Sequence, residues 1–206
     1  MLVIVDYGSG NVGSIVNMLA RAGIEATIGN SPEAIRSAAS LILPGVGAFD
    51  SVIGRFSQSG LMDAVLERVR VGIPILGICV GMQILSLGSD EGDLPGLGLI
   101  RSRTTSLRSM IDDKDARIPH MGWSNLTIRQ PSPLLQNLPQ DARFYFVHSF
   151  AVVCDEAEQC IATIEYQGND RITAIIQRDH IFGVQFHAEK SRNFGMMLLR
   201  NFAVIR

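Results

Sequence analysis

The chain has 206 residues, of which 47 % are hydrophobic and 18 % are charged, so it can bury one substantial core. This composition excludes an intrinsically disordered protein, and the net charge of −2 excludes the basic field that generic nucleic-acid binding needs. The three cysteines form an odd, sparse set, which argues against a secreted disulfide scaffold and predicts a reducing compartment.

Membrane insertion and export are not expected from the sequence. No segment reaches the roughly 18 uninterrupted apolar residues of a membrane span. The first residues, Met1–Asp6, lack the basic start and the small-residue cleavage site of a signal peptide. We therefore expect a cytoplasmic protein that binds neither membrane nor nucleic acid.

Short apolar runs alternate with helical patterns over the first ninety residues. Leu2–Val5 reads as a strand buried on both faces, and a helical spacing of apolar residues follows it. Further strands are predicted at Glu25–Ile28, at Leu41–Leu43 (stopped by Pro44-Gly45) and at Ile73–Ile78. Helices are predicted over Val12, Ile15, Val16 and Leu19, from Pro32 to about Ala39, over Leu61, Val65 and Val69, and over Met82, Ile84 and Leu85. This alternation predicts an α/β fold with a doubly wound, mostly parallel sheet flanked by helices.

The pattern changes after Leu87. Residues 88–98 are rich in Gly, Asp and Pro, and residues 101–117 are polar, which predicts a surface excursion or an antiparallel extension in the C-terminal half. Strands are predicted at Arg143–Val147, Ala151–Cys154, Ile161–Tyr166, Ile172–Gln177 and Ile181–Phe186, and a closing helix at Arg192–Phe202. Without repeats or low-complexity tracts, residues 1–206 are expected to form a single domain.

One cysteine lies where a buried strand meets a predicted helix. Gly77-Ile78-Cys79-Val80-Gly81 matches the G-x-nucleophile-x-G pattern with sulfur as the nucleophile. The glycines permit a sharp turn, and the helix start that follows favours a thiolate. The alternative is a small buried cysteine in a glycine-flanked turn, but the flanking strand and helix favour a nucleophile.

A base and an orienting acid are available at another strand end. His187 and Glu189 follow the strand Ile181–Phe186, and residues two apart on an extended chain point to one side. Cys79, His187 and Glu189 therefore form a candidate catalytic triad at the carboxyl ends of the strands. The other three histidines, His120, His148 and His180, are interpreted as packing or surface residues.

Two glycine-containing loops also bear on function. Pro44-Gly45-Val46-Gly47 offers bare backbone, and the N–H groups of Gly47 and Val80 are candidate oxyanion donors. Gly8–Gly13 matches G-x-G-x-x-G, so a nucleotide-binding module is an alternative, although no acidic residue closes the second strand. No ligand spacing predicts a metal site, and no cofactor is expected.

Six segments in order resemble the class I glutamine amidotransferases, and within them the glutaminase subunits of imidazole glycerol phosphate synthase. They are Asp6–Asn11, Leu43–Phe49, Gly77–Gln83, His120–Trp123, Tyr145–Ser149 and Gln185–Ser191. The resemblance spans nearly the whole chain.

The resemblance implies a glutaminase with a Cys79–His187–Glu189 triad, which hydrolyses glutamine to glutamate and ammonia through a thioester at Cys79. It implies that Gln83 and the backbone at Gly47, Ser149 and Phe150 hold the substrate. It further implies a heterodimer with a (β/α)₈-barrel synthase subunit, which activates the glutaminase and receives ammonia for histidine biosynthesis. The positions that match the subunit interface are Asn11, Trp123, Tyr145 and Lys190.

Three departures from the family pattern leave alternatives open. Ala188 stands where the family nearly always has proline, so a looser His187–Glu189 geometry is expected. Val12-Gly13-Ser14 and Ser191–Gly195 resemble instead paralogues that supply ammonia for amidine formation on bacterial surface sugars. The ammonia acceptor, and with it the barrel partner, is therefore not fixed by the sequence.

Overall fold

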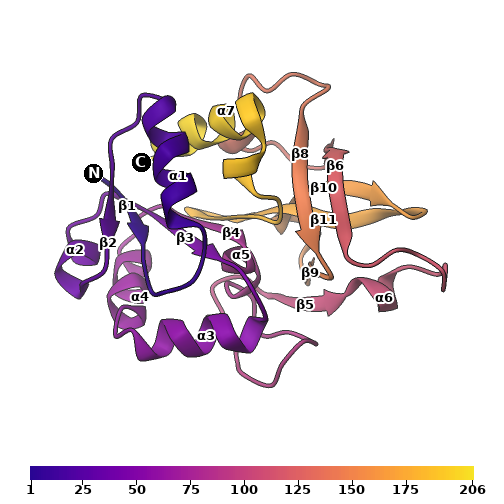
Figure 1. Ribbon diagram of the computed structural model, residues 1–206, viewed down its shortest axis with the longest axis horizontal. Helices are drawn as coiled ribbons and strands as arrows, with labels where there is room; N and C mark the ends of the chain where they lie inside the picture. Colours follow the sequence, from indigo (N-terminus) through magenta and orange to yellow (C-terminus); the bar gives the residue numbers. More distant parts are fainter.

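The computed structural model describes residues 1–206 and centres on an eight-stranded sheet (Figure 1). Its strand order is β2-β1-β3-β4-β12-β11-β10-β7. The first five strands in this order are parallel, and the last three run antiparallel to their neighbours. Their bounds are β1 Leu2–Val5, β2 Ala26–Gly29, β3 Ser40–Gly45, β4 Ile75–Cys79, β7 Thr127–Ile128, β10 Cys160–Tyr166, β11 Asn169–Arg178 and β12 Ile181–Val184. The predicted α/β class with a mostly parallel sheet is confirmed.

Helices cover both faces of the parallel part. In Figure 1, α1 and α7 lie above the sheet, and α2, α3 and α4 lie below it. Their bounds are α1 Val12–Arg21, α2 Pro32–Arg36, α3 Phe49–Gln58, α4 Met62–Arg70, α5 Val80–Gln83, α6 Leu107–Met110 and α7 Arg192–Ala203. Ser31 caps α2 through its side chain, as its place before Pro32 predicted.

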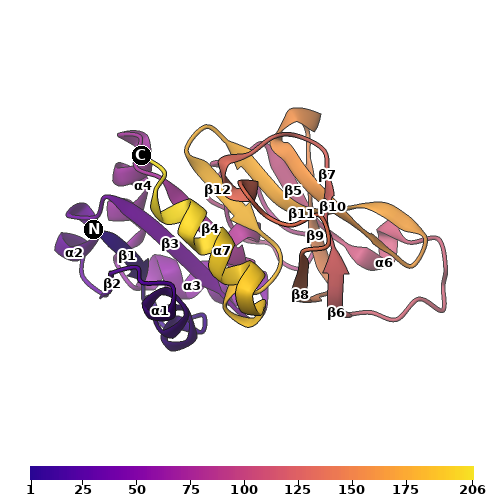
Figure 2. The same cartoon turned by 90° about the horizontal axis from the view of Figure 1, so that it is seen from above.

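The C-terminal half forms the predicted antiparallel extension. Two small two-stranded sheets lie beside the end of the main sheet, β5 with β9 and β6 with β8 (Figure 2). Their bounds are β5 Ser102–Ser106, β6 His120–Asn125, β8 Arg143–His148 and β9 Phe150–Cys154. Short 3₁₀ turns at Pro133–Leu135, Ala157–Gln159 and Ala188–Lys190 complete the chain. The predicted excursion at residues 101–117 thus contains a paired strand and one helical turn.

Several predicted boundaries were wrong. The strand at Leu41–Leu43 continues through Pro44 and Gly45, because pairing with β1 ends at Ile42 and the proline loses no hydrogen bond there. The helix from Pro32 ends at Arg36 instead of Ala39. The helix expected over Met82–Leu85 is the single turn α5, and α3 was not predicted at all.

The core is one continuous cluster of 54 buried residues. Phenylalanines fill much of it, and β1, β3 and β4 are buried along their whole length. Both chain termini lie at the same end of the molecule, near the amino ends of the parallel strands (Figures 1 and 2). No helix is long and apolar enough to span a membrane.

Candidate active site

Cys79 occupies a strained turn at the carboxyl end of the central strand β4. Its backbone has φ 57° and ψ −116°, in the half of conformational space that residues other than glycine rarely adopt. It directly precedes the turn α5 and is buried, with 4 % of its surface exposed. The sharp strand-to-helix turn predicted from the glycine pattern is therefore present.

Three glycines make this turn sterically possible. A Cβ atom on Gly81 would lie 1.9 Å from the Leu43 carbonyl oxygen. One on Gly77 would lie 2.5 Å from the Gly81 carbonyl oxygen, and one on Gly45 2.5 Å from the Gly81 nitrogen. The backbones of β3, β4 and α5 thus approach each other more closely than side chains allow, which explains the glycines on both sides of Cys79.

His187 and Glu189 are in contact. The Nδ1 atom of His187 lies 2.8 Å from Oε1 of Glu189, and the Glu189 side chain is 2 % exposed. The second carboxylate oxygen, Oε2, is buried without a hydrogen-bond partner. The chain here is a 3₁₀ turn beginning at Ala188, so the extended backbone assumed in the prediction was wrong. With Ala188 at the start of the turn, the imidazole and the carboxylate still lie at hydrogen-bonding distance.

The environment of His187 favours its protonated form. Burial lowers the pKa of this imidazole, but the interactions with Cys79 and Glu189 outweigh burial and raise the pKa to about 9. The imidazole therefore carries two protons at neutral pH. A charged imidazole beside a thiol and a buried carboxylate is the arrangement that nucleophilic catalysis by sulfur uses.

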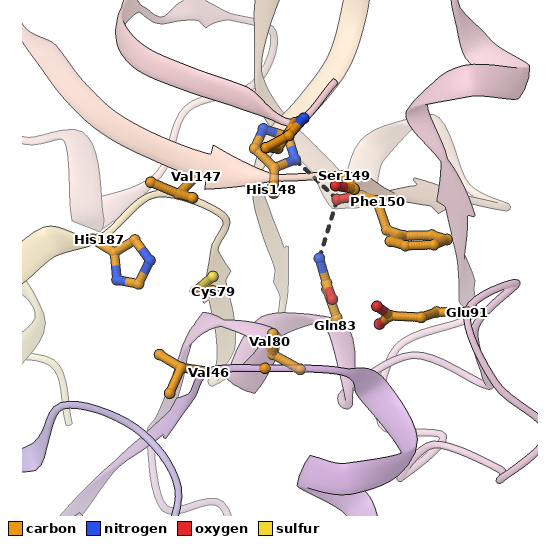
Figure 3. A pocket seen from close by; sticks show the side chains of 12 residues that line it. Val46, Cys79, Val80, Gln83, Glu91, Val147, His148, Ser149, Phe150 and His187 are labelled. Carbon is orange, nitrogen blue, oxygen red and sulfur yellow. Dashed lines mark hydrogen bonds between the residues drawn. The ribbon is translucent and has the colours of Figure 1, made fainter. Parts of the chain in front are cut away.

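A pocket of about 300 Å³ contains these groups (Figure 3). Its size is at the lower end of small-molecule sites. The pocket is lined by both Cys79 and His187 and by all five predicted substrate-binding or oxyanion residues, Gly47, Val80, Gln83, Ser149 and Phe150. Gln83 donates through Nε2 to the Phe150 carbonyl at 3.1 Å, a bond drawn in Figure 3.

Glu91 also lines the pocket and was not predicted. Its side chain lies across from Phe150 in Figure 3, and its Oε2 accepts a hydrogen bond from the Phe49 N–H at 2.8 Å. The Asp50 carboxylate in turn accepts from the N–H groups of Asp93 and Leu94. The Gly- and Asp-rich segment is therefore fastened to the start of α3. Glu91 belongs to an irregular loop, so no periodicity or motif could have placed it in the pocket.

The Gly8–Gly13 loop supports the segment beside the nucleophile. The Tyr7 hydroxyl donates to the Pro44 carbonyl, and the Ser9 hydroxyl donates to the carbonyl and accepts from the N–H of Val46. Gly10 has φ +95°, and a Cβ there would lie 2.7 Å from the Pro44 side chain. These contacts show that the loop supports Pro44–Gly47. Gly10 therefore has a structural role that does not require a bound nucleotide.

Three of the four residues predicted at the subunit interface form one cluster. The rings of Trp123 and Tyr145 lie 5.7 Å apart, edge to face, and the Lys190 ammonium lies 5.9 Å from the centre of the Tyr145 ring. Trp123 is 41 % exposed. The fourth residue, Asn11, is exposed and caps α1, a helix that packs against the 3₁₀ turn containing Lys190.

His120 and His148 are buried and bonded to each other, so the surface alternative for them was wrong. His120 Nδ1 lies 3.1 Å from His148 Nε2, and His148 lines the pocket. Burial lowers the pKa of His120 to about 4 and, with smaller effects from neighbouring groups, that of His148 to about 3. The imidazoles of His120 and His148 are therefore neutral at neutral pH, whereas that of His187 is charged.

The buried histidine pair is expected to make the folded chain less stable at acidic pH. Unfolded histidine titrates near 6.5, so below that pH the unfolded chain binds protons that the folded chain does not, and stability falls. We expect a loss on the order of 1 to 2 kcal/mol for each histidine between pH 7 and pH 5. His187 acts in the opposite sense, because its contribution is complete below pH 6.5 and is lost as the pH rises through about 9. Urea unfolding at pH 5, 6 and 7 tests this, and an unchanged free energy of unfolding would contradict it.

The remaining cysteines are remote from this chemistry. Cys154 and Cys160 line a different groove, on β9 and β10, and are not joined by a disulfide. Burial raises the pKa of the Cys154 thiol to about 12 and also raises that of Cys160. No group of three or more His, Cys, Asp or Glu side chains is arranged to hold a metal ion.

Comparisons with known proteins identify the fold and the relatives. Residues 3–205 match the family model of glutamine amidotransferase class-I. The chain is 45 % identical to "Imidazole glycerol phosphate synthase subunit HisH 2" of Methanococcus maripaludis, over 98 % of each chain. It is 42 % identical to a protein of the same name from Pseudomonas aeruginosa, over 98 % of each, and 41 % identical to subunit HisH of Bdellovibrio bacteriovorus, over the whole of each.

Solved structures share the architecture at low sequence identity. PurLQS from Thermotoga maritima superposes with a TM-score of 0.73 at 17 % identity, covering 98 % of this chain and 96 % of that one. A structure described as a glutamine amidotransferase gives 0.71 at 20 % identity, covering 98 % and 99 %. These likenesses establish the fold.

Proposed function

Because the chain belongs to the class I glutamine amidotransferase family, we propose that it is the glutaminase subunit of an imidazole glycerol phosphate synthase. The names of relatives at 41–45 % identity support this assignment over the surface-sugar and nucleotide-binding alternatives. The observation that carries the chemistry is a strained cysteine in one pocket with a histidine that is paired to a buried glutamate.

The proposed reaction begins at Cys79. The proton of the Cys79 thiol resides on His187, in line with the raised pKa of this imidazole, and the Cys79 sulfur attacks the side-chain amide carbon of glutamine. His187 then donates its proton to the departing nitrogen, so that ammonia leaves and a glutamyl thioester remains. Water, deprotonated by His187, attacks the thioester and releases glutamate and the free thiol. Glu189 keeps the imidazole oriented and stabilises its charged form, which the raised pKa of His187 supports.

We assign the binding of glutamine to the other residues of the pocket. The N–H groups of Gly47 and Val80 would stabilise the oxyanion of the tetrahedral intermediate. Gln83 and the backbone of Ser149 and Phe150 would hold the amino-acid end of the substrate, since all three line the pocket beyond Cys79 (Figure 3).

Glu91 is proposed to bind the α-ammonium group of glutamine. It is an acidic side chain that lines the pocket without an ion-pair partner, and one of its oxygens already caps α3. We expect Glu91→Gln to raise KM for glutamine about tenfold with kcat within twofold, because a carboxylate–ammonium contact is worth about 1.5 to 3 kcal/mol. The amide oxygen can still cap α3. Steady-state kinetics against the control Asp93→Asn, on the same loop outside the pocket, tests this, and equal KM values for Glu91→Gln and wild type would contradict it.

The partner is proposed to be a (β/α)₈-barrel synthase subunit that contacts the face around Trp123, Tyr145, Lys190 and Asn11. Trp123 on this face is exposed, the Tyr145 ring against it is half-buried, and Met121 nearby is 63 % exposed, as expected of a surface that binds another protein. The test is glutamate release by the chain with and without the synthase subunit and its ligand. No glutamate above background in the complete mixture would overturn the proposed function.

Arg192 is expected to contribute to subunit binding. Its guanidinium lies 5.4 Å from the centre of the Trp123 ring, and Arg143, Lys190 and Arg192 take part in no ion pair. We expect Arg192→Glu to weaken binding of the synthase subunit at least tenfold, since it removes the contact with the Trp123 ring and reverses one of three unpaired positive charges on this face. Arg70→Glu, on α4 across the sheet, serves as the control. Calorimetric titration measures both, and equal affinities would exclude this role.

We also propose a cytoplasmic location. The chain has only three cysteines, an odd and sparse set, as expected of a protein in a reducing compartment. The biosynthetic names of the relatives agree with this location.

A further inference from the structure

A continuous set of hydrogen bonds links the proposed partner face to the glutamine pocket. On β6, the Ser124 hydroxyl lies 3.2 Å from His120 Nε2, next to the exposed Trp123. His120 Nδ1 lies 3.1 Å from His148 Nε2, because the two residues are directly paired in the β6–β8 ribbon. His148 Nδ1 then lies 2.9 Å from the Phe150 carbonyl oxygen.

The direction of every bond in this series follows from its last member. The Phe150 carbonyl can only accept, so His148 carries its proton on Nδ1. A neutral His148 then has a lone pair on Nε2, and His120 must donate to it from Nδ1. The remaining nitrogen of His120 accepts from the Ser124 hydroxyl. One carbonyl thus fixes the tautomers of both rings.

The same carbonyl organises the pocket on its other side. It accepts from Gln83 Nε2, and this nitrogen also donates to Gln185 Oε1 at 3.0 Å. Gln185 Nε2 in turn points at the Cys79 sulfur, 3.8 Å away. Both amide hydrogens of Gln83 are therefore used within the protein, so its Oε1 is the atom left to meet a substrate N–H.

The pair is enclosed by apolar and aromatic side chains. The His120 ring packs against the rings of Phe146 and Tyr166, at centre distances of 5.1 and 4.1 Å. His120 and His148 are 3 % and 5 % exposed. Burying an imidazole is costly unless its hydrogen bonds are made. If these two positions only filled space, apolar residues would therefore be favoured there.

We propose that His120 and His148 are positioning residues, which fix the Phe150 carbonyl and through it the Gln83 amide of the glutamine pocket. This inference rests on the proposed function. It predicts that loss of the pair weakens substrate binding far more than it changes the reactivity of the sulfur, which meets this network only through the 3.8 Å contact from Gln185. It also makes β6 the strand through which binding of a subunit at Trp123 would affect the geometry of the pocket.

The test compares two reagents for Cys79. The glutamine-like electrophile 6-diazo-5-oxo-L-norleucine must bind the pocket before it reacts, whereas iodoacetamide needs only the thiolate. We expect His148→Phe to slow labelling by the first reagent about tenfold through a higher half-saturation concentration, and to leave the iodoacetamide rate within twofold. His148→Asn, whose amide can still donate to Phe150, is expected to restore labelling to within threefold of wild type. His120→Phe is expected to have an effect similar to that of His148→Phe and not additive with it.

Each outcome decides the proposal. The proposal would be overturned if His148→Phe slowed labelling equally with both reagents, or if it did not slow labelling by the glutamine analogue. Additive effects in a variant that combines His120→Phe with His148→Phe would also overturn it. His180→Phe is the control, because His180 is bonded to the Val69 carbonyl at the amino end of β12 and its loss should change neither rate. If His148→Phe does not fold, His148→Asn and His120→Phe carry the test. A wild-type chain that reacts with iodoacetamide but never with the glutamine analogue would instead overturn the proposed function, and with it this inference.

Discussion

Replacing Cys79 by alanine is expected to lower glutamate release by at least about 10⁴-fold. The variant lacks the sulfur that we propose forms the thioester, and among the other side chains that line the pocket only Ser149 offers a hydroxyl in its place. The loss should appear in kcat, because glutamine can still bind. The assay is glutamate release by the complex with the synthase subunit, combined with circular dichroism to show that the variant is folded.

The two other cysteines provide matched controls. Cys154→Ala and Cys160→Ala remove thiols whose pKa burial raises, in a groove separate from the pocket. Both variants should retain full activity, and mass spectrometry should find the glutamine analogue on the peptide containing Cys79 in each. Activity within tenfold of wild type in Cys79→Ala would rule out this cysteine as the nucleophile.

The second large effect is expected from Gly81→Ala, which adds one methyl group. Because that Cβ would lie 1.9 Å from the Leu43 carbonyl oxygen, β3 and α5 must move apart. We expect a loss of roughly 3 kcal/mol in the free energy of unfolding and a fall in Tm of about 10 °C. Activity should fall at least tenfold even in the folded protein, since the displaced turn carries Cys79.

Gly54→Ala is the matched control for this change. Gly54 lies within α3, and a Cβ there would meet nothing within 4 Å. The same substitution should therefore stabilise the chain by about 1 kcal/mol, because alanine is the better helix former. Thermal unfolding of both variants measures the contrast, and a Gly81→Ala variant as stable as wild type would show that the turn can relax.

The fold was predictable where burial dominates the pattern. The parallel strands β1, β3, β4 and β12 are buried along their whole length and read as largely apolar runs. The predicted bounds of these strands and of the edge strand β2 agree with the structure to within two residues. Strands β6 and β7 were missed because half or more of their residues are exposed. Helix α3 was missed although Val52, Ile53 and Phe56 are buried along it, a spacing that the same rule would have detected.

The parts of the site that were predictable are those whose residues lie close together in the sequence. Gly77–Gly81 and the His187–Glu189 pair each sit within five residues, so their motifs survive in the sequence. Glu91 lines the pocket from an irregular loop, and His148 lines it while bonded to His120 through strand pairing between distant segments. Such contacts depend on register and on loop path, which no single local pattern encodes.

The placement of the chain termini has a practical consequence for building on this protein. Both ends emerge together near the amino ends of the parallel strands (Figure 1), whereas the pocket lies at the carboxyl ends. An affinity handle, a fluorophore or a surface anchor attached to either end would thus leave the edge that carries the pocket unobstructed. A single-chain fusion to the proposed synthase partner would instead need a linker long enough to run from this end to the proposed partner face.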